Sequence, residues 1–210
     1  MTKHTVFDEH IDQYEKWFCD NDYVYKSELK AISQLLPPEG KGVEIGVGSG
    51  IFALPFGIKE GCDPSPVMRA KARERGINAV SGTAEKSPYN TGSFDFALMV
   101  TTICFVDDAQ KSIREVFRIL KDKGNFIIAF VDKNSPIGKQ YMKHKNESIF
   151  YKEATFYSTQ EIYNLLWENG FKILKIAQTI FGELSEVNEI QQPLNSYGKG
   201  SFVVIKAEKQ

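Results

Sequence analysis

The chain has 210 residues, of which 42% are hydrophobic and 25% charged, and its formal net charge at pH 7 is −1. This composition is typical of one globular domain with a sizeable core, and the nearly balanced charge gives no general attraction for nucleic acid. The sequence starts without a signal-peptide pattern and has no apolar run near the roughly 18 residues of a membrane span, so we expect a cytoplasmic protein that binds neither nucleic acid nor membranes.

The first segment, from Phe7 to Leu36, has apolar residues at steps of three and four, which predicts two helices. It is rich in aromatic residues, among them Tyr14 and Trp17. Such a stripe is typical of core packing, and its functional alternative is a lid over a binding site. We expect residues 1–38 to form an N-terminal helical cap that ends in a Pro-Pro-Glu-Gly turn.

The stretch from Lys41 to Gly50 predicts a ligand loop. A short apolar strand leads into glycines at positions 46, 48 and 50. These glycines allow positive φ angles and let a flat ligand lie directly on the backbone. Glu44 places a carboxylate at the end of the strand, where an unpaired charge would be costly to bury. The alternative, a glycine-rich turn without a ligand, leaves this carboxylate unexplained.

A second acidic residue follows at the end of the next strand. Beyond Gly50 the chain offers barely one helical turn before Pro55, so we expect a curtailed helix there. The short strand after it ends at Asp63, which is well placed to accept hydrogen bonds from ribose hydroxyls. Ser65 and Pro66 have the pattern of an N-cap and a first helical residue. The alternative for Asp63 is a role in this turn alone.

Strands and helices then alternate with short connections, which predicts a parallel sheet covered by helices on both faces. The expected elements are a helix from Pro66 to Arg75, strands over 77–81, 94–100 and 126–131, and a helix capped by Asp107 or Asp108. The strand 94–100 is apolar almost throughout, as in the middle of such a sheet. Ligands bind outside the carboxyl ends of the strands, where Gly46, Asp63, Thr83 to Glu85 and Thr101 would lie.

The last third of the chain begins with a long basic and aromatic segment, residues 134–157. We expect this segment to carry a helix or to cover the active site. Ser158 to Glu161 has the capping-box pattern, and the helix that it begins should reach Gly170. Two final strands, Phe171–Thr179 and Ser201–Lys206, suit an antiparallel pair at the sheet edge.

In their order and spacing these motifs resemble the class I S-adenosylmethionine-dependent methyltransferases, in the small-molecule, type 11-like branch. The resemblance covers about residues 7–207 and rests on Glu44-Ile45-Gly46-Val47-Gly48-Ser49-Gly50, Asp63, Gly82-Thr83-Ala84-Glu85, Ser93-Phe94-Asp95, Arg118-Ile119-Leu120-Lys121, Gly124 and Gly170-Phe171. It implies an α/β, Rossmann-like fold with a seven-stranded, mostly parallel sheet in the order 3-2-1-4-5-7-6, strand seven antiparallel. One domain would span residues 1–210, with the cofactor-binding core at 39–133 and a substrate-side cover plus the last two strands at 134–210.

The resemblance also implies S-adenosylmethionine as the cofactor and a role for each motif residue. The methionyl part would meet Gly46, Gly48, Gly50 and Thr101, and its ammonium group would meet Glu44 directly or through water. The ribose would meet Asp63 and Pro64, and the adenine would lie near Thr83, Ala84 and Glu85. Two residues depart from the family pattern: Thr83 stands where many relatives have Asp, and Phe105 stands where many have His.

Methyl transfer from a sulfonium mainly requires alignment of the acceptor and exclusion of water. A neutral amine acceptor needs no base, whereas a hydroxyl or carbon acceptor does. The candidate bases are His10, Tyr14, Asp132, His144 and Tyr151, and the candidate substrate contacts are Tyr14, Trp17, Phe105 and Tyr141. The three cysteines, Cys19, Cys62 and Cys104, and the other potential ligands lack metal-site spacing, so we expect no metal.

The sequence therefore predicts methyl transfer from S-adenosylmethionine to an N, O or C atom of a small molecule. One alternative is a nicotinamide-dependent oxidoreductase, which would need GxGxxG leading into a full helix, whereas here the third glycine comes one residue early and Pro55 follows. Another is a cofactor-binding relative without catalysis. Val100-Thr101-Thr102-Ile103 lacks the Asn-Pro-Pro-Tyr or Asp-Pro-Pro-Tyr sequence of methylases that act on adenine bases or glutamine side chains.

Overall fold

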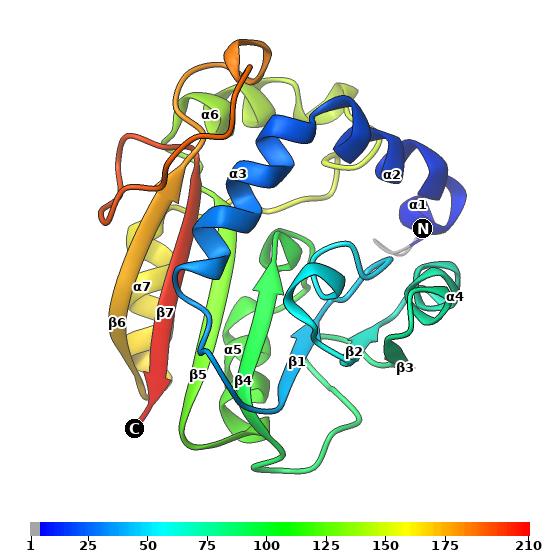
Figure 1. The fold of residues 1–210 in the computed structure, drawn as a ribbon, viewed down its shortest axis with the longest axis vertical. Coiled ribbons are helices and arrows are strands. Elements are labelled where there is room, and N and C mark those ends of the chain that lie inside the picture. The colour runs from blue at the N-terminus through cyan, green and yellow to red at the C-terminus, as the bar shows by residue number, and fades with distance from the viewer. Residues whose placement is uncertain (1–4) are drawn as a thin grey trace.

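The structure, a computed structural model, describes residues 5–210 and is built around one seven-stranded sheet (Figure 1). The strands are β1 (Gly42–Ile45), β2 (Glu60–Asp63), β3 (Asn78–Ser81), β4 (Phe94–Val100), β5 (Leu120–Val131), β6 (Phe171–Thr179) and β7 (Phe202–Lys209). Their order is β3-β2-β1-β4-β5-β7-β6, which confirms the predicted order and places β4 at the centre. Strand β7 runs antiparallel to both β5 and β6, and the other neighbours pair in parallel.

Strand β5 starts earlier than the sequence predicts. Leu120 already pairs with Phe94, and the regular ladder resumes where Asn125 pairs with Phe96. The residues between them include Lys123 in the left-handed region, with φ of 62°. The predicted turn over 121–124 is therefore an irregularity within the strand.

Helices cover both faces of the sheet. On one face, α5 (Ala109–Ile119) and α7 (Thr159–Glu168) share a core with Ala97 and Met99 of β4. On the other face, the N-terminal helices and α4 (Pro66–Glu74) share a core with Leu98 of the same strand. Because successive side chains of a strand point to opposite faces, the apolar sequence of β4 serves both cores.

The N-terminal cap contains three helices rather than the predicted two: α1 (Thr5–Glu9), α2 (Ile11–Asp20) and α3 (Asp22–Ser33). His10 and Asn21 separate them, with φ angles of −127° and −116° that leave helical geometry. The helices pass over the end of the sheet toward which β1 and β4 point (Figure 1). This is the end at which ligands of parallel sheets bind.

The loop after β1 forms turns and the 3-10 helix Leu54–Phe56 instead of an α-helix, as predicted from Pro55. Side chains from outside the loop hold its backbone. The Tyr25 hydroxyl of α3 donates to the Ile51 carbonyl at 2.6 Å, and the Arg75 guanidinium donates to the Ser49 carbonyl at 2.7 Å.

Arg75 also ties this loop to α2. Its two terminal nitrogens donate to the Glu15 carboxylate at 2.5 and 2.8 Å, so a single guanidinium links α2, the end of α4 and the glycine loop. Bidentate pairs of this kind are among the more directional polar contacts in proteins. The N-terminal cap thus supplies order that a helix after β1 would otherwise give.

The segment between β5 and α7 carries α6 (Pro136–Lys143) and the 3-10 helix Lys145–Glu147, as the sequence predicts. It then returns to the sheet, where the Thr155 amide donates to the Cys104 carbonyl at 2.7 Å. The capping box at Ser158 and Glu161 is confirmed. None of the helices within residues 5–210 has the length and apolar character needed to cross a membrane.

Candidate active site

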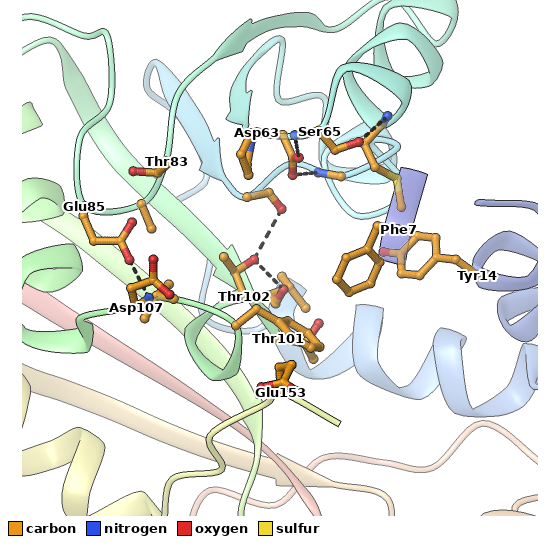
Figure 2. A pocket seen from close by; sticks show the side chains of 18 residues that line it. Phe7, Tyr14, Asp63, Ser65, Thr83, Glu85, Thr101, Thr102, Asp107 and Glu153 are labelled. Atoms are coloured by element: carbon orange, nitrogen blue, oxygen red, sulfur yellow. Dashed lines mark hydrogen bonds between the residues drawn. The ribbon is translucent and has the colours of Figure 1, made fainter. Parts of the chain in front are cut away.

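A cavity of about 530 Å³ opens at the carboxyl ends of β1, β2 and β4 (Figure 2). The loops after these strands, the turn after β3, the helices α1 and α2, and the segment before α7 all contribute to its wall. Small-molecule sites typically have volumes of roughly 300–1,000 Å³. The cavity therefore has both the place and the size of a ligand site in an open α/β sheet.

Asp63 joins the end of β2 to the glycine loop. One of its carboxylate oxygens accepts a hydrogen bond from the Gly48 amide at 2.9 Å, and the other accepts one from the Ser65 amide at 2.8 Å. Gly46 and Gly48 both line the cavity, with φ angles of +70° and +52°. A Cβ at Gly46 would lie 2.3 Å from Cγ2 of Thr102, so this position has room only for glycine.

The carboxylate of Asp63 retains capacity to bind a ligand. Burial raises its pKa, and the two amide hydrogen bonds and nearby Arg69 act in the opposite direction. An ionised carboxylate offers about four acceptor sites, of which the two amides occupy two. Asp63 lines the cavity and therefore fits a ligand with two neighbouring hydroxyl donors.

Glu44 lies beneath the glycine loop rather than in the cavity wall. It is buried, and its Oε2 atom has no hydrogen-bond partner among residues 5–210. Burial raises the pKa of this carboxyl well above its usual range, the charge of Asp63 adds to the effect, and the Ala53 amide partly offsets it. A buried acceptor without a partner is costly, and a cationic group bound at the loop would lower that cost.

Gly50, the third glycine of the loop, also lies outside the cavity wall. Its φ is +83°, and a Cβ there would lie 2.3 Å from Cδ1 of Ile77. Gly50 therefore has a role in the turn and in packing against Ala72 of α4 and Ile77, and its place beside a cofactor stays a prediction.

The turn after β3 forms another part of the wall. Thr83, Ala84 and Glu85 all line the cavity, and Ala84 is buried. The Glu85 carboxylate accepts a hydrogen bond from the amide of Asp107 at 2.7 Å (Figure 2) and another from the amide of Asp108 at 3.3 Å. Glu85 thus connects this turn to the start of α5 and places an acidic edge beside the predicted adenine position.

Thr101 and Thr102 form the tip of β4 and separate the two ends of the cavity. Thr101 has a φ of +50°, a left-handed conformation that non-glycine residues adopt mainly where surrounding structure imposes it. The Thr102 hydroxyl lies 3.1 Å from the Val100 carbonyl and 3.3 Å from the Gly46 carbonyl. The strand tip is therefore held against the glycine loop.

An aromatic wall closes the other side of the cavity. The ring of Phe7 on α1 contacts Phe105 edge to face at 5.1 Å and Tyr14 at 5.9 Å, and all three residues line the cavity. Tyr151 stacks on Phe105 from outside the lining, at 6.0 Å. Glu153 lies on the side of Thr101 away from Asp63 (Figure 2).

Of the five candidate bases, only Tyr14 lines the cavity. Burial raises the pKa of its phenol, and the charges of Glu44 and Asp63 raise it further. The phenol therefore stays protonated near neutral pH, where it can donate a hydrogen bond but is a poor base.

The structure places the other four candidate bases elsewhere. Asp132 uses its carboxylate within the fold, accepting from the Asn134 amide at 2.7 Å and from the Thr159 amide and hydroxyl at 2.9 and 2.5 Å. His144 is exposed and pairs with Glu147 at 3.1 Å. His10 and Tyr151 pack on the outer side of the aromatic wall, so an acceptor in the cavity would not reach any of the four.

Two of the four predicted substrate contacts also lie away from the main cavity. Trp17 and Tyr141 line a second space of about 20 Å³, beside the buried Glu28. Tyr14 and Phe105 do line the main cavity. The helical spacing that singled out Trp17 and Tyr14 together does not distinguish a side chain that faces the ligand from one that packs one turn away.

Several cavity residues were not predicted from the sequence as ligand contacts: Phe7, Ser65, Met68, Val100, Thr102, Val106, Asp107 and Glu153. Most of these residues are next to a predicted residue in the sequence, so a prediction that included the neighbours of each predicted residue would have contained them. Phe7 and Glu153 are different, because only the packing of α1 and of the segment after α6 brings them to the cavity. The sequence carries no local signal for either.

Comparison with known proteins places this fold among methyltransferases. Residues 43–128 match the methyltransferase domain family. An uncharacterized protein of Methanocaldococcus jannaschii is 43% identical over 204 residues, 97% of this chain and 98% of that protein. A structure of a Thermotoga maritima protein, described as a SAM-dependent methyltransferase and possible histamine N-methyltransferase, is 47% identical with a TM-score of 0.96, and the match covers 99% of this chain and 100% of the other. The chain belongs to the class I S-adenosylmethionine-dependent methyltransferases.

Membership of this methyltransferase family implies S-adenosylmethionine rather than a nicotinamide cofactor. A further relative, the uncharacterized methyltransferase YcgJ of Bacillus subtilis, is 27% identical over 164 residues, 70% of this chain and 62% of that protein. Among residues 5–210 of the methyltransferase, no three or more His, Cys, Asp or Glu side chains are grouped to hold a metal ion.

Proposed function

We propose that this methyltransferase transfers the methyl group of S-adenosylmethionine to a small-molecule acceptor. The observation that carries the proposal is the position of Asp63, which lines the cavity, holds the amides of Gly48 and Ser65, and retains capacity for two hydroxyl donors. That arrangement suits the ribose of the cofactor.

The other cavity residues fit the rest of the same cofactor. In this proposal the adenine lies at the turn Thr83–Glu85, and the methionyl part lies along Gly46 and Gly48, where no side chain intervenes. Its ammonium group lies toward Glu44, whose buried carboxyl has an oxygen without a partner in the described chain. Thr101 faces the reacting end.

When bound, S-adenosylmethionine supplies a methyl group activated by a positively charged sulfur. Transfer of this group to a lone pair of the acceptor would leave the bonding electrons on sulfur, and the proton that an N–H or O–H acceptor loses would pass to solvent once the site opens. The chain contributes alignment and exclusion of water. Phe7, Tyr14 and Phe105 provide the apolar wall for this purpose.

The site favours an acceptor that needs little help from a base. Tyr14 is the one predicted base in the cavity wall, and its raised pKa keeps it protonated. A protonated phenol can orient an acceptor through a hydrogen bond. Acceptors that react as neutral amines are compatible with this arrangement, since they need no deprotonation during attack.

The first test is calorimetric titration with S-adenosylmethionine, S-adenosylhomocysteine and NAD. We expect micromolar binding of the first two and none of NAD. Asp63→Ala should weaken that binding about 100-fold, because charged hydrogen bonds contribute on the order of 1.5–3 kcal/mol each. Asp122→Ala is a matched control, since the Asp122 side chain is 97% exposed. Binding of NAD in place of the other two ligands would sink the proposal.

The second test is turnover. Purified protein with labelled S-adenosylmethionine should methylate at least one member of a panel of small amines, phenols and carboxylates. Histamine belongs in the panel because the Thermotoga relative is described as a possible histamine N-methyltransferase. Tight cofactor binding without transfer to any acceptor would favour the alternative of a methyltransferase-fold protein without catalysis.

A further inference from the structure

We propose that the acceptor carries a protonated amine at a position other than the atom that is methylated, and that Glu153 binds this cation within the cavity. This inference rests on the proposed methyl transfer and names the class of acceptor that the same site would take. Neither the family nor the sequence motifs assign Glu153 a role, and the evidence for it comes from the charges and packing of the cavity wall.

The cavity wall is acidic. Its charged side chains are Asp63, Glu85, Asp107 and Glu153, and no Lys, Arg or His is among the described residues that line it. Asp63 and Glu85 hold backbone amides at the ribose and adenine ends. The wall itself therefore offers no cation to an anionic acceptor, whereas it offers carboxylates to a cationic one.

Glu153 differs from the other acids of the wall. It is an exposed residue at the cavity wall, and its side chain forms no hydrogen bond or ion pair with any residue from 5 to 210, so its carboxylate is accessible to a ligand. Its backbone is nevertheless well placed: the Ala154 amide donates to the Tyr151 carbonyl at 2.9 Å, and the Thr155 amide donates to Cys104 at 2.7 Å. The chain thus holds an unused carboxylate at a defined point beyond the tip of β4.

The surroundings of Glu153 also suit a cation with an apolar body. Phe7 and Phe105 also line the cavity and contact each other edge to face at 5.1 Å. Aromatic faces attract ammonium groups, and they pack against alkyl or aromatic chains. Glu153 lies on the opposite side of Thr101 from Asp63, so it is separate from the predicted ribose position (Figure 2).

The test compares ligands that differ only in charge. Protein saturated with S-adenosylhomocysteine is titrated by calorimetry with 2-phenylethylamine, 2-phenylethanol and 3-phenylpropionate, and with n-hexylamine, hexanol and heptanoate. We expect each amine to bind at least about tenfold more tightly than its alcohol or carboxylate counterpart, because a charge-assisted hydrogen bond contributes on the order of 1.5–3 kcal/mol.

Two variants assign the preference to one side chain. Glu153→Gln should weaken amine binding about fivefold to tenfold, leave alcohol binding unchanged and leave the affinity for S-adenosylhomocysteine unchanged. Glu147→Gln is the matched control, because Glu147 lies in the same segment, has a 78% exposed side chain and does not line the cavity. It should change none of these affinities.

The outcomes separate this inference from the proposed function. If the unaltered protein did not bind S-adenosylhomocysteine, this result would count against methyl transfer itself. The role of the cation would be overturned if the protein bound S-adenosylhomocysteine but bound amines and carboxylates equally well. It would also be overturned if the protein bound S-adenosylhomocysteine but no amine. An amine preference that survives in Glu153→Gln would overturn the role of Glu153.

Discussion

The two ends of the cavity are built in different ways. At the proposed cofactor end, Asp63, Gly48 and Ser65 come from adjacent strand tips, and the Asp63 carboxylate accepts hydrogen bonds from the two amides at 2.8–2.9 Å. At the proposed acceptor end, Phe7 and Glu153 come from segments far apart in the chain, and the wall forms mainly through ring contacts. Hydrogen bonds to backbone amides fix position closely, whereas ring contacts tolerate a change of side chain. The first end suits an invariant ligand, and the second suits one that differs between relatives.

The largest expected effect is at the cofactor end. Gly46→Ala should destabilise the protein by about 4 kcal/mol, because it adds an overpacked contact to left-handed strain. A Cβ at Gly46 would lie 2.3 Å from Thr102. Chemical denaturation measures the stability, and calorimetry should show that cofactor binding is lost.

Gly57→Ala is the control that isolates the contact. Gly57 has a φ of +67°, close to the +70° of Gly46, but a Cβ there would meet nothing within 4 Å. Gly57→Ala should therefore lower the free energy of unfolding only by the backbone strain, about 1–2 kcal/mol. Equal losses in the two variants would show that Thr102 does not restrict the loop.

A second prediction contrasts the buried carboxylates of the two ends. Burial raises the pKa of both carboxyls, but two amide hydrogen bonds and Arg69 oppose this at Asp63, whereas burial acts alone at Glu28 on α3 and raises its pKa to about 8. The folded protein then keeps a proton that the unfolded chain releases above its ordinary pKa of 4.5. Unfolding in this window releases the proton, so stability falls as pH rises from 4.5 to 8 and levels off above.

Glu28→Gln removes this proton linkage. Relative to the unaltered protein, the variant should gain on the order of 3 kcal/mol at pH 9 and little at pH 4.5. Denaturation curves across this pH range measure the difference. Glu39→Gln, at an exposed site, should follow the unaltered protein. Parallel pH profiles for Glu28→Gln and the unaltered protein would contradict the raised pKa.

A third prediction concerns the aromatic wall. Phe7→Ala should raise the KM for the acceptor about fivefold and lower stability by about 1 kcal/mol, because it removes ring contacts with Phe105 and Tyr14. The affinity for S-adenosylhomocysteine should change less than the KM does, since the Asp63 carboxylate and its two amide hydrogen bonds stay intact and Phe7 reaches the glycine loop only through Tyr14. Tyr23→Ala, at a ring that is 47% exposed, should change neither the KM for the acceptor nor the stability. A change confined to cofactor affinity would reverse the assignment of the two ends.

The smallest expected effect is at Glu85. Glu85→Gln keeps an oxygen for the Asp107 amide but loses the negative charge beside the predicted adenine. Affinity for S-adenosylhomocysteine should fall about threefold, as expected for a partly exposed charged hydrogen bond. Calorimetry measures this effect, with Glu74→Gln on the exposed face of α4 as the control. No change would mean that adenine recognition uses the backbone alone.

The fold was predictable because its signals are local. The apolar strand 94–100, the Ser65-Pro66 helix start and the capping box at Ser158 each depend on a few neighbouring residues, and the structure confirms all three. The strand order came from the family resemblance and is confirmed as well. The early start of β5 was not predicted, because the pairing of Leu120 with Phe94 depends on a partner strand rather than on local sequence.

The candidate site was predictable on one side only. The glycine loop and Asp63 carry spacing that reflects backbone geometry, so the sequence points to them directly. Asp132 has the same pattern, an acid at a strand tip, yet its carboxylate binds Asn134 and Thr159 in the fold. Glu153 has no pattern at all, because it reaches the cavity only through the packing of a long connection. Local spacing identifies a strand tip but not which of its acids remain available to a ligand.

The loop after β1 is held by side chains from two N-terminal helices and from α4, through Tyr25, Glu15 and Arg75. Folding of the cap and order in the glycine loop are therefore linked equilibria. A ligand that binds only the ordered loop must stabilise α2 and α3, and loosening these helices must lower the affinity for that ligand by the same free energy. Helices α2 and α3 would therefore contribute to the free energy of cofactor binding, although they lie outside the family's glycine motif.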